Sequence, residues 1–143
     1  MKAKAVVLVV EDDRFLASLI RQSLLDNGVA VVLATHGGEA LTMADDVRPD
    51  LIVLDGMMPV LDGFEVLKRL KANPRHAARP VLMLTARRSE TDVQRALSAG
   101  AADYLAKPLR IDVFLERTMR LLKAPRADLS KSPDGRSEVR RVS

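Results

Sequence analysis

The sequence predicts an α/β fold: one doubly wound parallel sheet of five strands that alternate with five helices. Three observations support this prediction. Two apolar runs, residues 6–10 and 51–54, show no alternation with polar residues, as expected of strands buried on both faces. Segments with apolar residues at helical spacing separate the predicted strands. This regular alternation of strands and helices is typical of a parallel sheet with helices on both faces.

The first half of the chain contains three predicted strands and two predicted helices. Residues 6–10 form the first strand. Residues 14–26 form a helix that ends at Asn27-Gly28, and its apolar residues at helical spacing are Phe15, Leu16, Leu19, Ile20 and Leu24. Residues 29–33 form the second strand. Residues 38–47 form a short helix whose inward residues are Ala40, Leu41 and Ala44. Residues 51–54 form the third strand.

The second half continues the alternation. Asp62 begins the third helix, whose inward residues are Phe64, Val66, Leu67 and Leu70. Pro80 precedes the fourth strand, residues 81–84. Ser89 is a favourable N-cap for a helix that runs to Ala99 and ends at Gly100. Residues 103–105 form a short fifth strand. Residues 111–123 form the last helix, with Ile111, Phe114, Leu115, Met119 and Leu122 at helical spacing.

Composition narrows the class of protein. The 143 residues are enough for one domain with its own core. Residues 124–143 carry five basic and three acidic residues, half of the net charge of +4, so the charge is too evenly spread to indicate nucleic-acid binding. The absence of cysteine excludes disulfides and thiolate metal sites. We find no signal peptide and no apolar stretch near the roughly 20 residues of a membrane helix, and we expect a cytoplasmic protein.

The helical and strand patterns stop near Ala124. Proline, glycine, serine and charged residues then dominate, which predicts a flexible basic tail or the start of a linker over residues 124–143. The predicted domain is therefore residues 1–123.

Carboxylates follow two of the predicted strands. Glu11-Asp12-Asp13 come after the first strand, and Asp55 comes after the third. The C-terminal ends of parallel strands lie at one edge of the sheet, where ligands bind. Two like charges about 4 Å apart repel by roughly 4 kcal/mol at an effective dielectric near 20, so the cluster predicts a bound divalent metal. We expect Asp13 to be a helix N-cap and not a ligand.

Four short motifs occur in order along the chain: Val9-Val10-Glu11-Asp12-Asp13, Leu54-Asp55-Gly56-Met57-Met58-Pro59, Leu84-Thr85-Ala86 and Lys107-Pro108. With these motifs, and with Gly63 and Gly100-Ala101-Ala102-Asp103-Tyr104, the chain resembles the receiver domain of bacterial two-component response regulators over residues 4–123. The resemblance implies a flavodoxin-like sheet with strand order 2-1-3-4-5. It also implies that a histidine kinase or a phosphotransfer protein phosphorylates one aspartate.

The resemblance assigns roles to individual residues. Asp55 is the expected phosphoacceptor, because a carboxylate at a strand end can attack phosphorus and form an acyl phosphate. The implied Mg²⁺ is held directly by Asp12, Asp55 and the backbone carbonyl of Met57, while Glu11 acts through water. Lys107, in a cis peptide with Pro108, is expected to contact the phosphoryl group.

Further residues are implied to set the response and its duration. Thr85 is expected to bond the phosphoryl group and Tyr104 to be the coupled switch residue. Gly56 leaves the acceptor open, and Met57 and Arg87 border the path of the attacking water. The resemblance thus implies a switch that assists its own phosphorylation and hydrolysis, and not a turnover enzyme.

The expected output surface comprises residues 89–99, 103–105 and 111–123. It would bind a downstream effector or a second copy of the domain, and its exposed residues include Arg88, Gln94 and Arg95. We expect this segment to bind neither nucleic acid nor membrane directly.

Three other classes of protein are alternatives to the receiver domain. A phosphohydrolase of the haloacid dehalogenase type needs a second aspartate two residues after its nucleophile, where this chain has Met57. A flavin- or nucleotide-binding protein would need a phosphate-binding loop after the first strand, where this chain has Glu11-Asp12-Asp13. For a DNA-binding regulator, no helix-turn-helix pattern follows Lys123 in these residues. The chain could still be the receiver part of a longer protein, because Arg140-Arg141-Val142-Ser143 is not an obvious natural terminus.

Overall fold

The computed structural model describes residues 4–58, 61–86 and 89–124. Its sheet has five parallel strands in the order β2-β1-β3-β4-β5, which confirms the expected topology. The strands are β1 (Val6–Val10), β2 (Ala30–Ala34), β3 (Leu51–Asp55), β4 (Val81–Thr85) and β5 (Asp103–Ala106). The helices are α1 (Arg14–Asp26), α2 (Gly37–Val47), α3 (Gly63–Ala72), α4 (Glu90–Ser98) and α5 (Ile111–Lys123).

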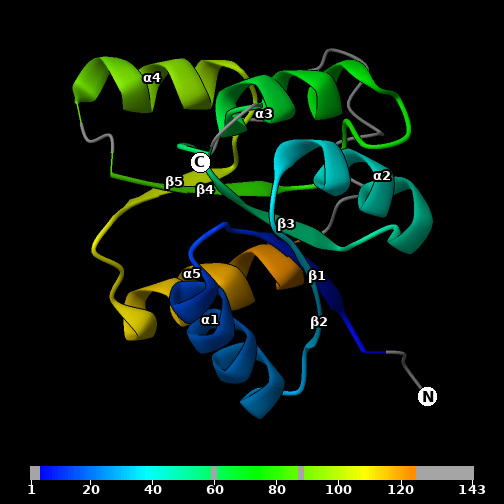
Figure 1. Cartoon of the computed structure of the whole chain (residues 1–143), viewed down its shortest axis with the longest axis vertical. Coiled ribbons are helices and arrows are strands. Elements are labelled where there is room, and N and C mark those ends of the chain that lie inside the picture. The colour runs from blue at the N-terminus through cyan, green and yellow to red at the C-terminus, as the bar shows by residue number, and fades with distance from the viewer. Residues whose placement is uncertain (1–3, 59–60, 87–88, 125–143) are drawn as a thin grey trace.

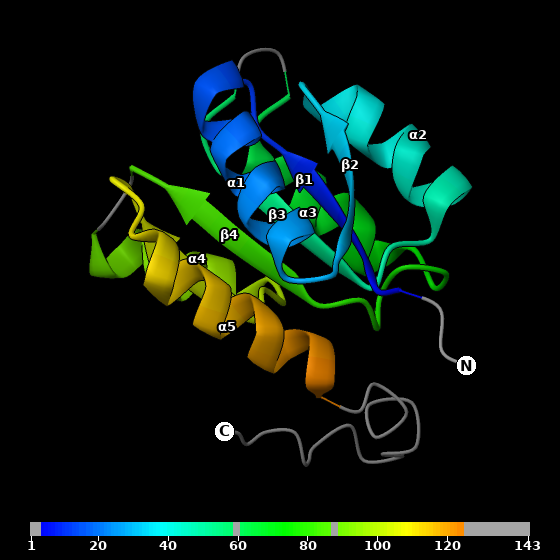
Figure 2. The ribbon, with the colours of Figure 1, turned by 90° about the horizontal axis from the view of Figure 1, so that it is seen from below.

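Helices cover both faces of the sheet. Figures 1 and 2 show α1 and α5 on one face and α2, α3 and α4 on the other. This three-layer arrangement follows from right-handed connections between parallel strands, which alternate faces where the strand order reverses. Within the described ranges, no helix has both the length and the apolar character needed to cross a membrane.

The sheet separates two hydrophobic cores. Alternate residues of a strand point to opposite faces. On the face covered by α2, α3 and α4, the strand residues of the core include Leu8, Val10, Ile52, Leu54 and Met83. On the other face they include Val7, Val9, Leu51, Val53 and Leu82. Every residue of β3 is buried, as its unbroken apolar run predicted, and in β1 every residue except Val6 is buried. Every residue of β4 is buried as well.

Side-chain caps begin the helices where the sequence predicted them. Asp13 accepts a hydrogen bond from the Leu16 N–H and caps α1. Asp62 caps α3, and Ser89 caps α4 in the same way. Each cap satisfies a backbone donor that has no partner inside its helix.

One strand differs from the prediction at its start, and one helix leaves two large apolar residues exposed. The second strand begins at Ala30 instead of Val29, because the Val29 N–H bonds the Leu24 carbonyl and belongs to the turn that ends α1. Phe15 and Leu19 lie on α1 at helical spacing but do not face the core, and their exposed fractions are 80% and 41%. The buried residues of α1 are Ala17, Ile20 and Leu24. Phe15 and Leu19 are four residues apart and share the opposite side of the helix.

The predicted tail cannot be compared with the structure. Residues 125–143 lie outside the described ranges, as do Arg87 and Arg88. The flexible tail, the water-path role of Arg87 and the surface role of Arg88 therefore remain predictions.

Candidate functional site

The strand register brings the predicted site residues to one edge of the sheet. Val10 pairs with Leu54, so Glu11 and Asp55 follow at neighbouring strand ends. Asp55 pairs with Leu84, and Thr85 pairs with Ala106. Four strands therefore deliver Glu11, Asp55, Thr85 and Lys107 to the same edge, as parallel strands require.

Asp55 is a buried carboxylate with fixed geometry. Its exposed fraction is only 2%. The Met57 N–H donates a 3.0 Å hydrogen bond to Oδ1, and Lys107 Nζ lies 3.4 Å from Oδ2. Burial raises the pKa of Asp55, because desolvation disfavours the charged form, although the Met57 N–H and Lys107 oppose this shift.

Glu11 is equally buried, with an exposed fraction of 1%. Oε1 lies 2.9 Å from Lys107 Nζ, and Oε2 accepts a 3.1 Å hydrogen bond from the Asp13 N–H. Burial raises the pKa of Glu11 to about 7, and repulsion by Asp55 adds to the effect, whereas the contact with Lys107 opposes it. Glu11 therefore holds its proton more tightly in the folded chain than in the unfolded chain.

Lys107 lies between the two buried carboxylates. Its peptide bond with Pro108 is cis, as the resemblance implied. The Lys107 N–H also bonds the Thr85 carbonyl and so fixes the chain beside β4. Burial alone would lower the pKa of Lys107, but its contacts with Glu11 and Asp55 raise it overall, so Lys107 carries a positive charge at neutral pH.

Asp12 completes an acidic cluster with Glu11 and Asp55. One carboxylate oxygen from each residue lies within 4.8 Å of the others. Asp12 is exposed, while the other two are buried, so the cluster opens to solvent on one side. Hard divalent cations prefer such carboxylate oxygens, and the donor set therefore fits Mg²⁺. The Met57 side chain is 48% exposed, and the predicted role of its carbonyl stays a prediction.

The two predicted switch residues occupy different environments. Thr85 is fully buried at the end of β4. Tyr104 on β5 is half-buried and packs against the core beneath α2, α3 and α4. Their strands are paired neighbours, because Met83 is opposite Tyr104 and Thr85 is opposite Ala106. Thr85 thus lies at the same edge of the sheet as the acidic cluster, and Tyr104 lies on β5, the strand next to β4.

Two glycines allow close packing around Asp55 that the sequence reasoning did not anticipate. A Cβ on Gly63 would lie 2.1 Å from the Asp55 carbonyl oxygen and 2.7 Å from the Gly56 Cα. A Cβ on Gly56 would lie 3.0 Å from the Thr85 Cβ and 3.2 Å from Cε2 of Phe64. The start of α3 can therefore contact the backbone of Asp55 only if residue 63 is glycine. The available signal was the position of Gly63 directly after the N-cap Asp62.

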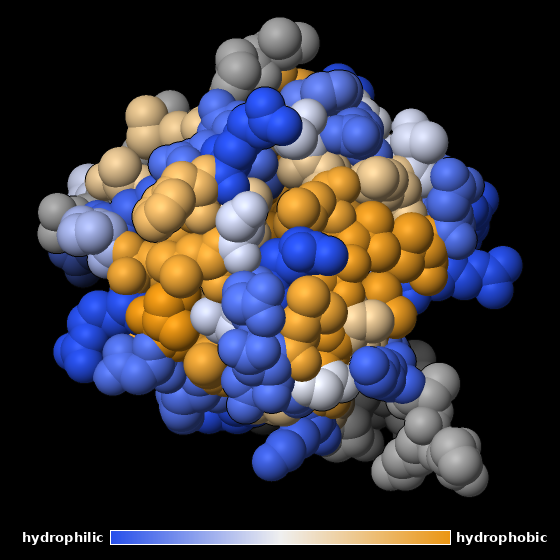
Figure 3. Space-filling model, turned by 60° about the horizontal axis from the view of Figure 1, so that its bottom comes forward, coloured by the Kyte–Doolittle hydropathy of each residue, from blue (hydrophilic) through white to orange (hydrophobic). Residues whose placement is uncertain are grey.

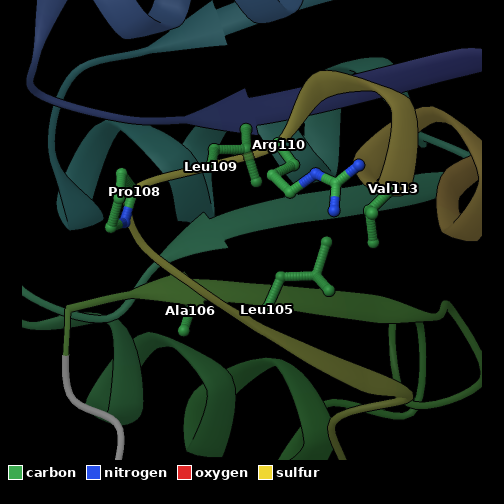
Figure 4. Close-up of a pocket in the computed structure, with 6 residues that line it drawn as sticks. All are labelled: Leu105, Ala106, Pro108, Leu109, Arg110 and Val113. Carbon is green, nitrogen blue, oxygen red and sulfur yellow. The ribbon is translucent and has the colours of Figure 1, made fainter.

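Apolar surface lies next to this edge of the sheet. Figure 4 shows a pocket in which the side chains of Leu105 and Val113 point toward each other, with Arg110 beside them. The pocket has a volume of about 180 Å³, and its lining residues are Leu105, Ala106, Pro108, Leu109, Arg110 and Val113. Figure 3 shows further apolar side chains over the face that carries α1 and α5. Phe15 is among the exposed apolar residues of α1.

Comparison with known proteins agrees with this geometry. A family model described as the response regulator receiver domain matches residues 7–119. A response regulator MprA from Mycobacterium sp. (strain KMS) is 44% identical over 128 residues, which cover 90% of this chain and 54% of the relative. MprA from Mycobacterium leprae is 44% identical over 122 residues, which cover 85% of this chain and 53% of that protein. This chain thus spans about half the length of these curated relatives.

Solved structures show the same fold. The chemotaxis protein CheY4 of Vibrio cholerae has a TM-score of 0.79 at 34% identity, covering 83% of this chain and 99% of CheY4. The receiver domain of the Francisella response regulator 1452 has a TM-score of 0.79 at 37% identity, covering 84% of this chain and 98% of that domain.

The raised pKa of Glu11 predicts a pH-dependent stability. In metal-free buffer, the unfolded chain releases the Glu11 proton near pH 4.5, whereas the folded chain holds it to about pH 7. The free energy of unfolding should therefore fall as pH rises through this interval, by about 3 kcal/mol from this residue. Urea unfolding from pH 4.5 to 7.5 should show that Glu11→Gln removes this fall.

Glu39→Gln is the control. The pKa of Glu39 is lowered by its hydrogen bond from the Thr35 N–H, so its contribution to stability has the opposite pH dependence. The fall should persist in this variant. Equal pH profiles for wild type and Glu11→Gln would contradict the prediction.

Proposed function

The chain belongs to the response regulator receiver domain family, and from this premise we propose that Asp55 accepts a phosphoryl group from a histidine kinase or a phosphotransfer protein. The observation that carries the proposal is that Asp55 lies within the acidic cluster and contacts Lys107 at the C-terminal edge of the sheet. The protein acts as a phosphorylation-dependent switch in two-component signalling and not as a turnover enzyme.

The chemistry is a phosphoryl transfer to a carboxylate. An Asp55 oxygen forms a bond to phosphorus while the bond between phosphorus and the donor histidine nitrogen breaks, and that nitrogen keeps the electron pair. The product is an acyl phosphate on Asp55. Because the Met57 N–H and Lys107 already hold the carboxylate, the attacking group needs little reorganisation.

Lys107 provides positive charge where the phosphoryl group would arrive. Its ammonium already contacts oxygens of both Glu11 and Asp55. After transfer, a phosphoryl oxygen can replace one of these carboxylate contacts, since an ammonium has three donors. The Thr85 hydroxyl is the second proposed donor to the phosphoryl group, because Thr85 ends the strand next to β3.

The acidic cluster fits Mg²⁺ as the cofactor. Asp12, Asp55 and the Met57 carbonyl would hold the ion, and Glu11 would act through water. When bound, Mg²⁺ neutralises charge on the phosphoryl oxygens and on the carboxylates. The grouping of Glu11, Asp12 and Asp55 oxygens within 4.8 Å of one another supports the assignment, because such carboxylates repel one another unless a cation lies among them.

The proposed donor is a protein whose surface meets the face around Asp12 and Asp13. Phe15 lies two residues after Asp13 and is 80% exposed, an unusual state for a large aromatic side chain. The pocket between β5 and α5 lies beside Lys107 and offers a second apolar contact (Figure 4). Apolar surface on both sides of Asp55 is suited to a protein partner.

The proposed output surface comprises α4, β5 and α5. Phe64 connects the site to this surface, because its ring lies next to Gly56 and the Arg95 guanidinium of α4 lies 4.4 Å from its centroid. A shift of Thr85 toward a phosphoryl group would change the packing of Gly56 and Phe64, and so the position of α4. An effector or a second copy of the domain would then bind this surface with altered affinity.

A phosphorylation assay tests the acceptor directly. With Mg²⁺ and a small phosphodonor such as acetyl phosphate, wild-type protein should gain the mass of one phosphoryl group, measured on the intact chain. Asp55→Asn should gain none, because an amide is not a competent nucleophile here. Asp112→Asn, which changes an exposed aspartate at the start of α5, should be phosphorylated like wild type. Full labelling of the Asp55→Asn protein would exclude Asp55 as the acceptor.

Thermal unfolding tests the metal site. Mg²⁺ at 100 times its dissociation constant should stabilise wild-type protein by about 2.7 kcal/mol. Asp12→Ala should be more stable than wild type without metal, since one repelling carboxylate is gone, and Mg²⁺ should no longer stabilise it. Asp46→Ala, at an exposed position of α2, should keep the full Mg²⁺ effect. An undiminished Mg²⁺ effect in Asp12→Ala would contradict the site.

Amide chemical shifts test the output surface. Phosphorylation of the wild type should shift resonances of α4 and β5. Thr85→Ala should still be phosphorylated but should lose most of these shifts, and Thr85→Ser, which keeps the hydroxyl, should restore them. Shifts confined to α1, with α4 unaffected in wild type, would show that the output surface is elsewhere.

A further inference from the structure

A second polar site lies at the edge of the sheet opposite Asp55. It is a pocket of about 330 Å³, and its lining residues are Asp45, Arg48, Arg75, His76 and Arg79. We call this set the arginine pocket. Two of its residues come from the end of α2, and three come from the connection between α3 and β4. This connection enters β4 at its N-terminal end, whereas Asp55 is at the C-terminal end of β3 (Figure 1).

His76 organises the arginine pocket. It is buried, with an exposed fraction of 3%, and its Nε2 lies 2.7 Å from Asp45 Oδ1. Its Nδ1 accepts a 3.0 Å hydrogen bond from Arg79 Nε–H. Since Nδ1 is an acceptor, the ring proton lies on Nε2 and His76 is neutral in this arrangement. Arg79 also donates a 2.6 Å hydrogen bond to the Pro49 carbonyl. These bonds join the end of α2 to the connection between α3 and β4.

The charges in the arginine pocket are unbalanced. Three guanidinium groups and one carboxylate line it. The single carboxylate is also already engaged, because Asp45 Oδ1 contacts both His76 Nε2 and Arg75 Nη2, the latter at 3.1 Å. Within the described part of the chain, the Arg48 guanidinium has no ion pair or side-chain hydrogen bond. An unmatched charge of this kind favours an anion.

The backbone places Arg48 at the pocket. Arg48 caps the C-terminus of α2 in the left-handed conformation, with φ of 55°. Few residues other than glycine adopt this conformation without a local reason. A cation near a helix C-terminus also stabilises the helix dipole. That effect can explain Arg48, but it does not explain two further arginines from another segment around the same pocket.

We propose that the arginine pocket binds the phosphate group of a small molecule, either inorganic phosphate or a phosphate monoester. The planar guanidinium group matches phosphate oxygens with two parallel hydrogen bonds. Arg48 and Arg75 are exposed and can turn toward an anion, while Arg79 and His76 form a fixed wall. This site is independent of phosphorylation at Asp55, since none of its residues belongs to the acidic cluster.

Nuclear magnetic resonance of the full chain without Mg²⁺ tests the proposal. Inorganic phosphate and glycerol 3-phosphate are titrated separately at pH 7.5, with sodium chloride at matched ionic strength as the reference. The amides of residues 45–50 and 73–79 should shift and saturate with both phosphates and not with chloride. Tighter binding of glycerol 3-phosphate would indicate a monoester as the ligand, and equal binding would indicate the phosphate group alone.

Substitutions locate the binding groups. Arg48→Gln and Arg75→Gln should each weaken binding by about tenfold, which corresponds to roughly 1.4 kcal/mol. Arg48→Lys and Arg75→Lys keep the charge and the fold but lose the guanidinium geometry, so they should weaken binding less than the glutamine variants. Arg110→Gln and Arg120→Gln, at exposed positions near and on α5, should leave it unchanged. Shifts that grow without saturation, or that weaken equally in the α5 controls, would overturn the proposal.

Discussion

The ion pairs of Lys107 with Glu11 and Asp55 determine the state of the acidic edge of the sheet. Two carboxylates that are almost fully buried would repel each other strongly, and a buried charge is costly unless it is paired. One ammonium group reduces this cost without removing it, as the raised pKa of Glu11 shows. At this edge one ammonium group therefore pairs with two buried carboxylates, and their repulsion is only partly offset. Such a site can respond to a cation or to a phosphoryl group with a change of contacts.

The backbone around Asp55 is packed closely against its neighbours. Gly63 brings the first turn of α3 against the Asp55 carbonyl, and Gly56 lets the Thr85 and Phe64 side chains approach its backbone. Arg95 then extends these contacts to α4 through the face of the Phe64 ring. In a close-packed interior, a displacement at one position must be accommodated by its neighbours. The described contacts thus form a continuous physical connection between the acidic cluster and α4.

The two edges of the sheet have opposite electrostatic character. The C-terminal edge collects Glu11, Asp12 and Asp55, whereas the arginine pocket lies where β3 and β4 begin. Parallel strands make this division possible, because the loops that leave the strands lie at one edge of the sheet and the loops that enter them lie at the other. Residues far apart in the sequence, such as Asp45 and His76, become neighbours in this way. The fold can therefore place two separate sites on one small domain.

The sequence alone determined the order of elements, the parallel sheet and the carboxylates at the strand ends. These features depend on local patterns: apolar runs, helical spacing, capping residues and the residue that follows each strand. Tertiary structure alone decided that Lys107 pairs with Glu11 as well as Asp55, that Gly63 touches the Asp55 backbone, and that Phe15 faces solvent. It also brought Asp45, His76 and Arg79 together. The physical reason is that helical spacing shows which residues share a face but not which face the sheet covers. Contacts between distant segments likewise depend on strand register and helix docking, which no local pattern encodes.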